Sequence, residues 1–178
     1  MHKLKSILPA AVPAALEKAL RYRLLNEPLE AESVCLDILR VDPANQEAQV
    51  TLLLARTDLF HDEYMAALER AKAALGPLED EYDRAYYEGV IYERWAKAQT
   101  ARRVPSHMVT GWYLHAMHCF ERAQALAAPD NPDAILRWNT CARVLARAGE
   151  TAPADQHITR DIVAEYDDEA PTVKVEPH

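Results

Sequence analysis

The chain has 178 residues, of which 49% are hydrophobic, enough apolar material for the core of one domain. Only 4 residues are glycine but 11 are proline, which favours several short helices separated by proline breaks. The formal net charge is −8 and no long basic run occurs, which argues against nucleic-acid binding. Cys35, Cys119 and Cys141 are far apart and form no CxxC pair, a pattern typical of a reducing compartment.

The first twenty residues begin basic and then turn apolar, as a signal peptide does. Pro9 and Pro13 interrupt the apolar part, however, and Glu17 and Lys18 end it early. No apolar run approaches the roughly 18 residues that a membrane span needs. We therefore expect this segment to lead into a helix, and we expect a cytoplasmic protein without membrane insertion.

Apolar residues at helical spacing, separated by turn residues, predict seven helices in chain order. The expected helical stripes run over residues 13–24, 31–39, 48–55, 64–75, 79–103, 107–127 and 132–148. Asn45 is a suitable N-cap for the third helix. Gly76 can close the fourth helix in the left-handed conformation, and Pro77 follows it directly. No segment alternates with the period of two that a half-buried strand needs, so the fold class is all-α.

The turn prolines Pro43 and Pro77 lie 34 residues apart, the period of a known helical repeat. Small residues that let paired helices approach closely recur at equivalent places: Ala31, Ala67, Gly89 and Ala116. On these residues the chain resembles the tetratricopeptide-repeat family. The resemblance implies a right-handed superhelical solenoid of about three antiparallel helix pairs plus a capping helix, over residues 1–149.

The sequence departs from the family pattern in two places. In the second repeat Leu53 stands where a small residue is usual, and Arg56 stands where an aromatic is usual. The third pair also contains about fifteen extra residues near 98–110, counted against the repeat period. Two interpretations stay open: both helices lengthen into a projecting hairpin, or residues 98–110 form a loop.

Residues 150–178 differ in composition from the rest of the chain. They hold eight acidic against two basic residues, a net charge of −6, which leaves −2 for residues 1–149. Such a segment buries too little apolar surface to order by itself, so we expect an acidic, disordered tail whose role is solubility rather than binding of a basic partner.

The resemblance implies that the first helix of each pair lines a concave groove that binds a segment of another protein. The groove residues are then expected to be Leu16, Leu20, Arg23, Val50, Leu54, Thr57, Tyr86, Val90, Glu93, Arg94, Leu136, Thr140 and Arg143. This set predicts a largely apolar floor. The alternative is that a short array closes on itself and that these residues belong to the core.

Two further groups of side chains could carry function. The aromatic residues of the third pair are expected mainly in the core, with Tyr87 as the best candidate for exposure. Four residues of the sixth helix could attract a metal: His107, His115, His118 and Cys119. Because an i, i+3 histidine pair offers only two ligands and Cys119 is expected to point elsewhere, we interpret these as surface histidines and predict no metal and no cofactor.

No phosphate-binding glycine loop, nucleophile elbow or metal-binding motif occurs, so the sequence does not predict an enzyme. The leading hypothesis is an adaptor or scaffold that binds a partner protein through the apolar groove or through the extended third hairpin. The alternative is a structural subunit of a homo-oligomer or larger complex. A metal- or cofactor-handling accessory protein is a weaker alternative.

Overall fold

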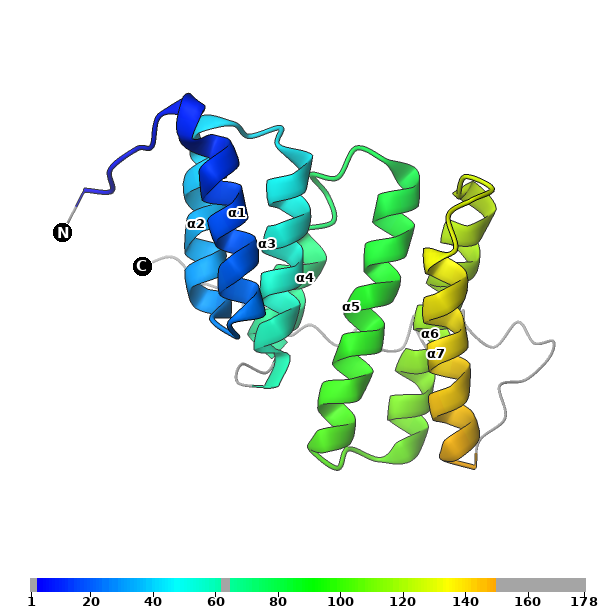
Figure 1. Ribbon diagram of the computed structural model, residues 1–178. Helices are drawn as coiled ribbons and strands as arrows, with labels where there is room; N and C mark the ends of the chain where they lie inside the picture. The colour runs from blue at the N-terminus through cyan, green and yellow to red at the C-terminus, as the bar shows by residue number, and fades with distance from the viewer. Residues whose placement is uncertain (1–2, 62–64, 150–178) are drawn as a thin grey trace, which may run out of the picture.

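The computed structural model describes residues 3–61 and 65–149, and within these ranges the chain is helical and contains no strand. The seven α-helices are α1 Val12–Leu24, α2 Pro28–Val41, α3 Gln46–Asp58, α4 Met65–Ala73, α5 Glu81–Ala101, α6 Ser106–Leu126 and α7 Asp133–Arg147 (Figure 1). Two 3₁₀ helices, Pro9–Ala11 and Leu59–His61, flank α1 and α3. The predicted all-α class is therefore confirmed, while the expected disordered tail lies outside the described residues.

The helices begin where capping chemistry allows. Asn45 caps α3 as predicted, since its side chain accepts a hydrogen bond from the backbone N–H of Ala48 at 2.9 Å. Asp80 caps α5 in the same way, through the backbone N–H of Tyr82 at 2.7 Å. Pro13 and Pro28 stand in the first turns of α1 and α2, where a missing N–H costs nothing.

The left-handed residues that follow helices lie elsewhere than at Gly76. Asn26 after α1 and Arg103 after α5 have φ values of 59° and 58°, and Gly149 after α7 has a φ of 79°. Gly76 has no positive φ, so its predicted left-handed closing role is wrong. At Arg103 the turn is fixed by a bond from the Val104 N–H to the Gln99 carbonyl, 3.2 Å long, which outweighs the small cost of the left-handed conformation.

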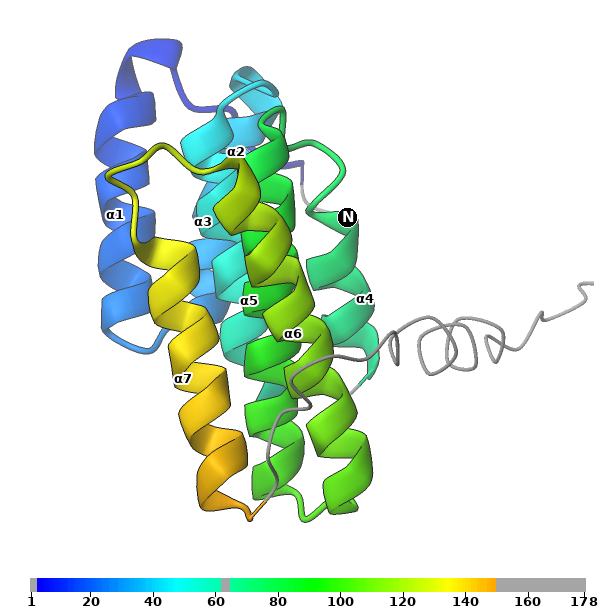
Figure 2. The same ribbon diagram turned by 90° about the vertical axis from the view of Figure 1, so that its right-hand side faces the viewer.

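The helices form two layers (Figure 1). Helices α1, α3, α5 and α7 lie side by side in one layer and run in the same direction, while α2, α4 and α6 lie behind them. Each helix contacts the next along the chain, and α1 also contacts α3, α3 contacts α5, and α5 contacts α7. In Figure 2, where the front of Figure 1 is on the left, the outer helices α1 and α7 lie further to the left than α3 and α5, so the front layer is curved. The right-handed superhelical arrangement stays a prediction.

Small residues lie at the predicted contacts between helices. Ala31, Ala67 and Ala116 have no exposed surface, and Gly89 is buried. A Cβ atom at Gly89 would lie 2.6 Å from Cε1 of Phe120, so only glycine lets α5 approach α6 this closely.

The third helix pair is longer than the others. Helices α5 and α6 each have 21 residues, whereas α1 and α3 have 13. Their lower ends extend beyond the ends of α1 and α2 (Figure 1). Most of the extra residues are therefore helical, with a turn only at residues 102–105, and the alternative of a loop over residues 98–110 is wrong. Absence of Gly and Pro between residues 94 and 103 permits the longer helix, and burial of Trp95, Ala98 and Gln99 along it stabilises it.

The aromatic residues lie mainly in the core, as predicted. Trp95 is 1% exposed and meets the ring of Phe60 edge-on at 5.4 Å between centroids. Tyr87 is half-buried between two core clusters, so its predicted exposure is wrong. Burial raises the pKa of the Tyr87 phenol to about 12.

Arg56, which stands where an aromatic residue was expected, connects three helices. Its Nε donates to Glu32 Oε1 of α2 at 2.9 Å, and its Nη1 donates to the backbone carbonyl of Arg70 in α4 at 2.9 Å. Both side chains of this ion pair are less than one-fifth exposed. Charge-assisted hydrogen bonds thus connect α2, α3 and α4 at the position where aromatic packing was expected.

Candidate partner-binding face

The curved front layer of α1, α3, α5 and α7 carries the residues expected to line a groove (Figure 1). We call this surface the concave face. The expected residues differ in how deeply they are buried. Leu16, Thr57 and Val90 are buried at 8%, 3% and 1% exposure. Val50, Leu54 and Tyr86 are half-buried and pack against the core clusters.

The remaining expected residues are either ion-paired or exposed. Arg23, Glu93 and Arg94 are half-buried and form ion pairs across the layer. The exposed ones lie at the two ends of the layer: Leu20 on α1, and Leu136, Thr140 and Arg143 on α7. The middle of the concave face is therefore charged, which corrects the expectation of a largely apolar floor.

One carboxylate joins three neighbouring helices at this face. Asp58 of α3 accepts a hydrogen bond from Nε of Arg23 on α1, at 2.8 Å to Oδ2. Its other oxygen accepts from Nη1 of Arg94 on α5, and that guanidinium also donates to Oγ1 of Thr57 at 2.8 Å. The three charged side chains are 16–27% exposed, so solvent screens them only partly.

A second ion pair continues the row from α5 to α7. Nη1 of Arg137 donates to both carboxylate oxygens of Glu93, at 3.2 and 3.1 Å. Burial raises the pKa of the Glu93 carboxyl, and the nearby Arg137 acts in the opposite direction. Ion pairs thus link all four helices of the front layer, through residues far apart in the sequence.

Cations exceed carboxylates in this row. Arg23 and Arg94 share Asp58, and Arg137 pairs with Glu93, the residue before Arg94. Burial lowers the pKa of Arg94, and the positive charges of Arg23 and Arg137 lower it further. The exposed Lys97 adds a fourth cation next to Glu93. We call Arg23, Arg94, Lys97 and Arg137 the basic cluster; its neighbouring carboxylates are Asp58 and Glu93.

Four acidic residues of α3, α5 and α7 lie at the opposite end of the layer. Glu47 lies in the first turn of α3, Glu81 and Asp83 in that of α5, and Asp133 in that of α7. Each charge complements the partial positive charge of its helix N-terminus. Because the four helices run in the same direction, these acids share one end of the layer and leave the basic cluster further along it (Figure 1).

Sequence reasoning missed Asp58, Lys97 and Arg137. The sequence did contain one indication of the Asp58 contacts. Asp58 lies 35 residues after Arg23 and 36 before Arg94, close to the expected repeat period of 34 residues. Residues one repeat apart occupy equivalent places on adjacent first helices, so opposite charges at this spacing indicate an ion pair. Arg137 lies 44 residues from Glu93, and no such regularity identifies it.

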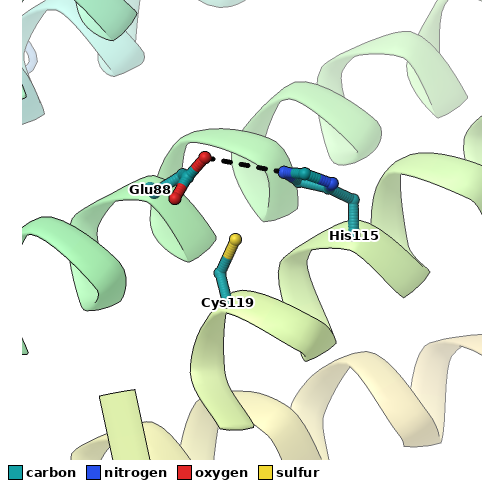
Figure 3. Close-up of side chains that lie close together, drawn as sticks. All are labelled: Glu88, His115 and Cys119. Carbon is teal, nitrogen blue, oxygen red and sulfur yellow. Dashed lines mark ion pairs between the residues drawn. The ribbon is translucent and has the colours of Figure 1, made fainter. Parts of the chain in front are cut away.

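The histidines separate in the structure. His107 and His118 are exposed, and His118 lies 3.9 Å from Glu121. His115 is mostly buried, with 15% of its side chain exposed, so its predicted surface position is wrong. Cys119 points to the same side of α6 as His115, contrary to expectation, because residues four apart share a helix face (Figure 3).

Comparison with family models, with curated proteins and with solved structures finds no match for this chain. The resemblance to the tetratricopeptide-repeat family therefore stays a prediction based on the small residues and the proline spacing. Among residues 3–61 and 65–149, no helix combines the length and apolar character that crossing a membrane requires.

Proposed function

We propose that this protein is a non-catalytic adaptor that binds an acidic segment of a partner protein on its concave face. The observation that carries the proposal is the basic cluster. Four cations lie beside only two carboxylates, in the middle of a curved layer of four helices. The tetratricopeptide-like, solenoid interpretation of the fold belongs to the same proposal.

The chemistry of the cluster favours carboxylates as the ligand. Guanidinium groups form bidentate, charge-assisted hydrogen bonds with carboxylates, and they form them more strongly where water is partly excluded. Arg94 and Arg137 are 27% and 34% exposed, so both are reachable and partly desolvated. Asp58 accepts from two guanidinium groups at once, which leaves part of their donor capacity for a ligand.

The shape and the margins of the face favour a protein segment over a small molecule. The layer spans four helices, and exposed leucines stand at both of its ends: Leu20 is 38% exposed on α1, and Leu136 is 57% exposed on α7. An extended or helical segment with acidic residues in its middle and apolar residues at its ends complements this arrangement.

The test is a binding titration with a defined probe. A short fluorescein-labelled Glu- and Asp-rich peptide is added to the full chain at low salt, and fluorescence anisotropy reports binding. A Lys-rich peptide of the same length is the control ligand. We expect saturable binding of the acidic peptide that weakens as salt is added, and no binding of the basic one.

Two variants locate the binding surface. Arg94→Gln removes one guanidinium while Asp58 keeps Arg23, and we expect about tenfold weaker binding, ~1.4 kcal/mol. Lys97→Gln changes only an exposed side chain and is expected to weaken binding about two- to threefold. The matched control is Arg40→Gln, an exposed arginine on α2 in the other layer. Equal affinity in all three variants would exclude the concave face.

A second candidate, a structural subunit that assembles with itself, has one observation in its favour. Leu24, Leu25 and Leu29 are 88%, 64% and 57% exposed around the turn between α1 and α2. Exposed leucines that lie together are a common feature of interfaces. Multi-angle light scattering separates the candidates: we expect a monomer, whereas an oligomer that Leu25→Asp dissociates would support the structural subunit.

A further inference from the structure

Three side chains of different chemistry converge on one point between α5 and α6. Glu88 extends from α5, and His115 and Cys119 extend from α6 (Figure 3). One ligand atom of each residue lies within 4.8 Å of the other two. His115 and Cys119 are four residues apart, which places both on the side of α6 that faces α5.

The distance between the ring and the carboxylate does not suit a hydrogen bond. His115 Nε2 and Glu88 Oε1 are 3.7 Å apart, beyond hydrogen-bonding range. Two ligands of one tetrahedral zinc ion, with bonds of about 2.0–2.3 Å, lie roughly 3.3–3.6 Å apart. The observed spacing is therefore close to that of two atoms bound to the same ion.

The imidazole of His115 forms no direct hydrogen bond, although the carboxylate of Glu88 lies 3.7 Å away. Both ring nitrogens are buried from solvent, and neither has a hydrogen-bond partner in the described part of the chain. Leaving a buried donor or acceptor without a partner destabilises the folded state. Coordination of a cation by Nε2 would satisfy one of the two nitrogens.

Neighbouring residues hold the three side chains in place. The ring of Tyr92 packs against that of His115, with 4.0 Å between centroids. Nη1 of Arg122 binds the other carboxylate oxygen of Glu88 at 3.2 Å, which leaves Oε1 turned toward the histidine. Such outer contacts orient the ligands of known metal sites.

We propose that Glu88, His115 and Cys119 form a three-ligand site for a divalent transition metal, with zinc the preferred ion. The carboxylate supplies Oε1, the neutral imidazole supplies Nε2, and Cys119 supplies Sγ as a thiolate. The proton of the Cys119 thiol is released to solvent when the metal binds. The charges of thiolate and carboxylate then balance that of the cation, and a water molecule completes the tetrahedron.

The donor set decides between metals. Thiolate and imidazole favour zinc and its neighbours in the first transition series, whereas magnesium and calcium require oxygen ligands. Burial raises the pKa of the Cys119 thiol, and the carboxylate of Glu88 raises it further. Because the metal displaces the proton of the thiol, metal affinity should increase with pH. The site does not depend on the proposed partner binding.

Cobalt(II) provides a direct test, because thiolate coordination gives a charge-transfer absorption in the near ultraviolet and tetrahedral geometry gives intense visible bands. We expect both signals when the reduced full chain is titrated with Co²⁺, and their loss when Zn²⁺ is added. Cys119→Ser should lose the charge-transfer absorption. Cys35→Ser and Cys141→Ser, at the other buried thiols, should keep it.

Thermal unfolding gives an independent readout, because Cys119 is a core position and its replacement perturbs packing. Zinc should raise the Tm of the wild-type chain, as any ligand of the native state does, and it should leave the Tm of Glu88→Gln and His115→Gln unchanged. His118→Gln, an exposed histidine, should respond like the wild type. Absence of the thiolate absorption in the folded wild type, or an equal zinc shift in all variants, would overturn the site.

Discussion

Gly89 lies where α5 and α6 approach each other, directly against the ring of Phe120. We expect Gly89→Ala to destabilise the protein, although alanine is the better helix former by about 1 kcal/mol. A Cβ atom 2.6 Å from a buried ring forces the helices apart, and overpacking of this kind costs about 1–3 kcal/mol. Urea unfolding followed by circular dichroism measures the difference.

Gly76→Ala is the matched control for that substitution. The nearest atom to a Cβ at Gly76 is the Ala73 carbonyl oxygen at 3.8 Å, an ordinary contact, and its φ is not positive. We expect a change within about 0.5 kcal/mol. A Gly89→Ala protein as stable as the control would show that the contact with Phe120 relaxes freely.

The three cysteine thiols are buried, and burial raises the pKa of Cys35 and of Cys141 to about 12 from 9.0. As the pH rises above 9, the thiols of the unfolded chain lose their protons while those of the folded chain keep them. The folded state then binds more protons than the unfolded state, so its stability falls between about pH 9 and pH 12. At or below neutral pH this contribution is fully present. Urea midpoints at a series of alkaline pH values should decline, and they should decline less in a Cys35→Ala, Cys141→Ala protein.

At the scale of single residues, the sequence predicted the features that depend only on residue type and local position. Asn45 as a cap and Gly89 as a close contact follow from residue type and position. The contacts of Asp58 and Arg56 could not be predicted in this way, because they depend on which face of α3 packs against which neighbouring helix. Gly76 shows the converse, since a residue suited to the left-handed conformation does not adopt it.

At the scale of helices, Arg56 connects α2, α3 and α4 through hydrogen bonds to Glu32 and to the Arg70 carbonyl. Arg56→Met keeps most of the side-chain bulk but leaves that carboxylate and carbonyl, both partly buried, without this partner. We expect a loss of about 1.5–3 kcal/mol in urea unfolding, the range for hydrogen bonds to charged groups.

The control and the compensating variant make this prediction specific. Arg40 lies 4.0 Å from Asp37 in an exposed pair, so Arg40→Gln should change stability by less than about 0.5 kcal/mol. Adding Glu32→Gln to Arg56→Met should recover part of the loss, since it removes the unpaired charge. If the double variant is no more stable than the single one, the ion pair does not account for the effect.

The existence and order of the helices could be predicted from periodicity and turn residues. The long third pair could be predicted only as one of two alternatives, because a run without Gly or Pro permits a helix but does not require it. What decided the outcome is packing: Trp95, Ala98 and Gln99 are buried along the extended part of α5. Such contacts depend on helices distant in the sequence.

At the scale of the whole molecule, the acidic segment 150–178 carries a net charge of −6 and the basic cluster is cationic. We expect the segment to contribute solubility rather than to occupy the concave face. The quadruple variant Glu165→Gln, Asp167→Asn, Asp168→Asn, Glu169→Gln should then bind the acidic peptide with unchanged affinity and precipitate at lower protein concentration. Tighter peptide binding by this variant would instead identify the segment as a competitor for the face.

The concave face itself could be predicted only in outline. Thirteen residues were expected there, and the structure distributes them between core, ion pairs and exposed ends. Hydrophobicity alone does not distinguish an apolar residue under a charged surface, such as Val90, from one exposed on it. Ion pairs between helices α1, α3, α5 and α7 require their relative positions, which no single helix encodes.

The sharing of Asp58 between Arg23 and Arg94 has a consequence for the kinetics of binding under the proposed function. Each guanidinium already has Asp58 as a counter-ion in the free protein. Under the proposed function, an arriving carboxylate therefore uses the donors that Asp58 leaves unused, and it meets positive charge that is already partly neutralised. We expect binding on such a surface to be readily reversible rather than tight.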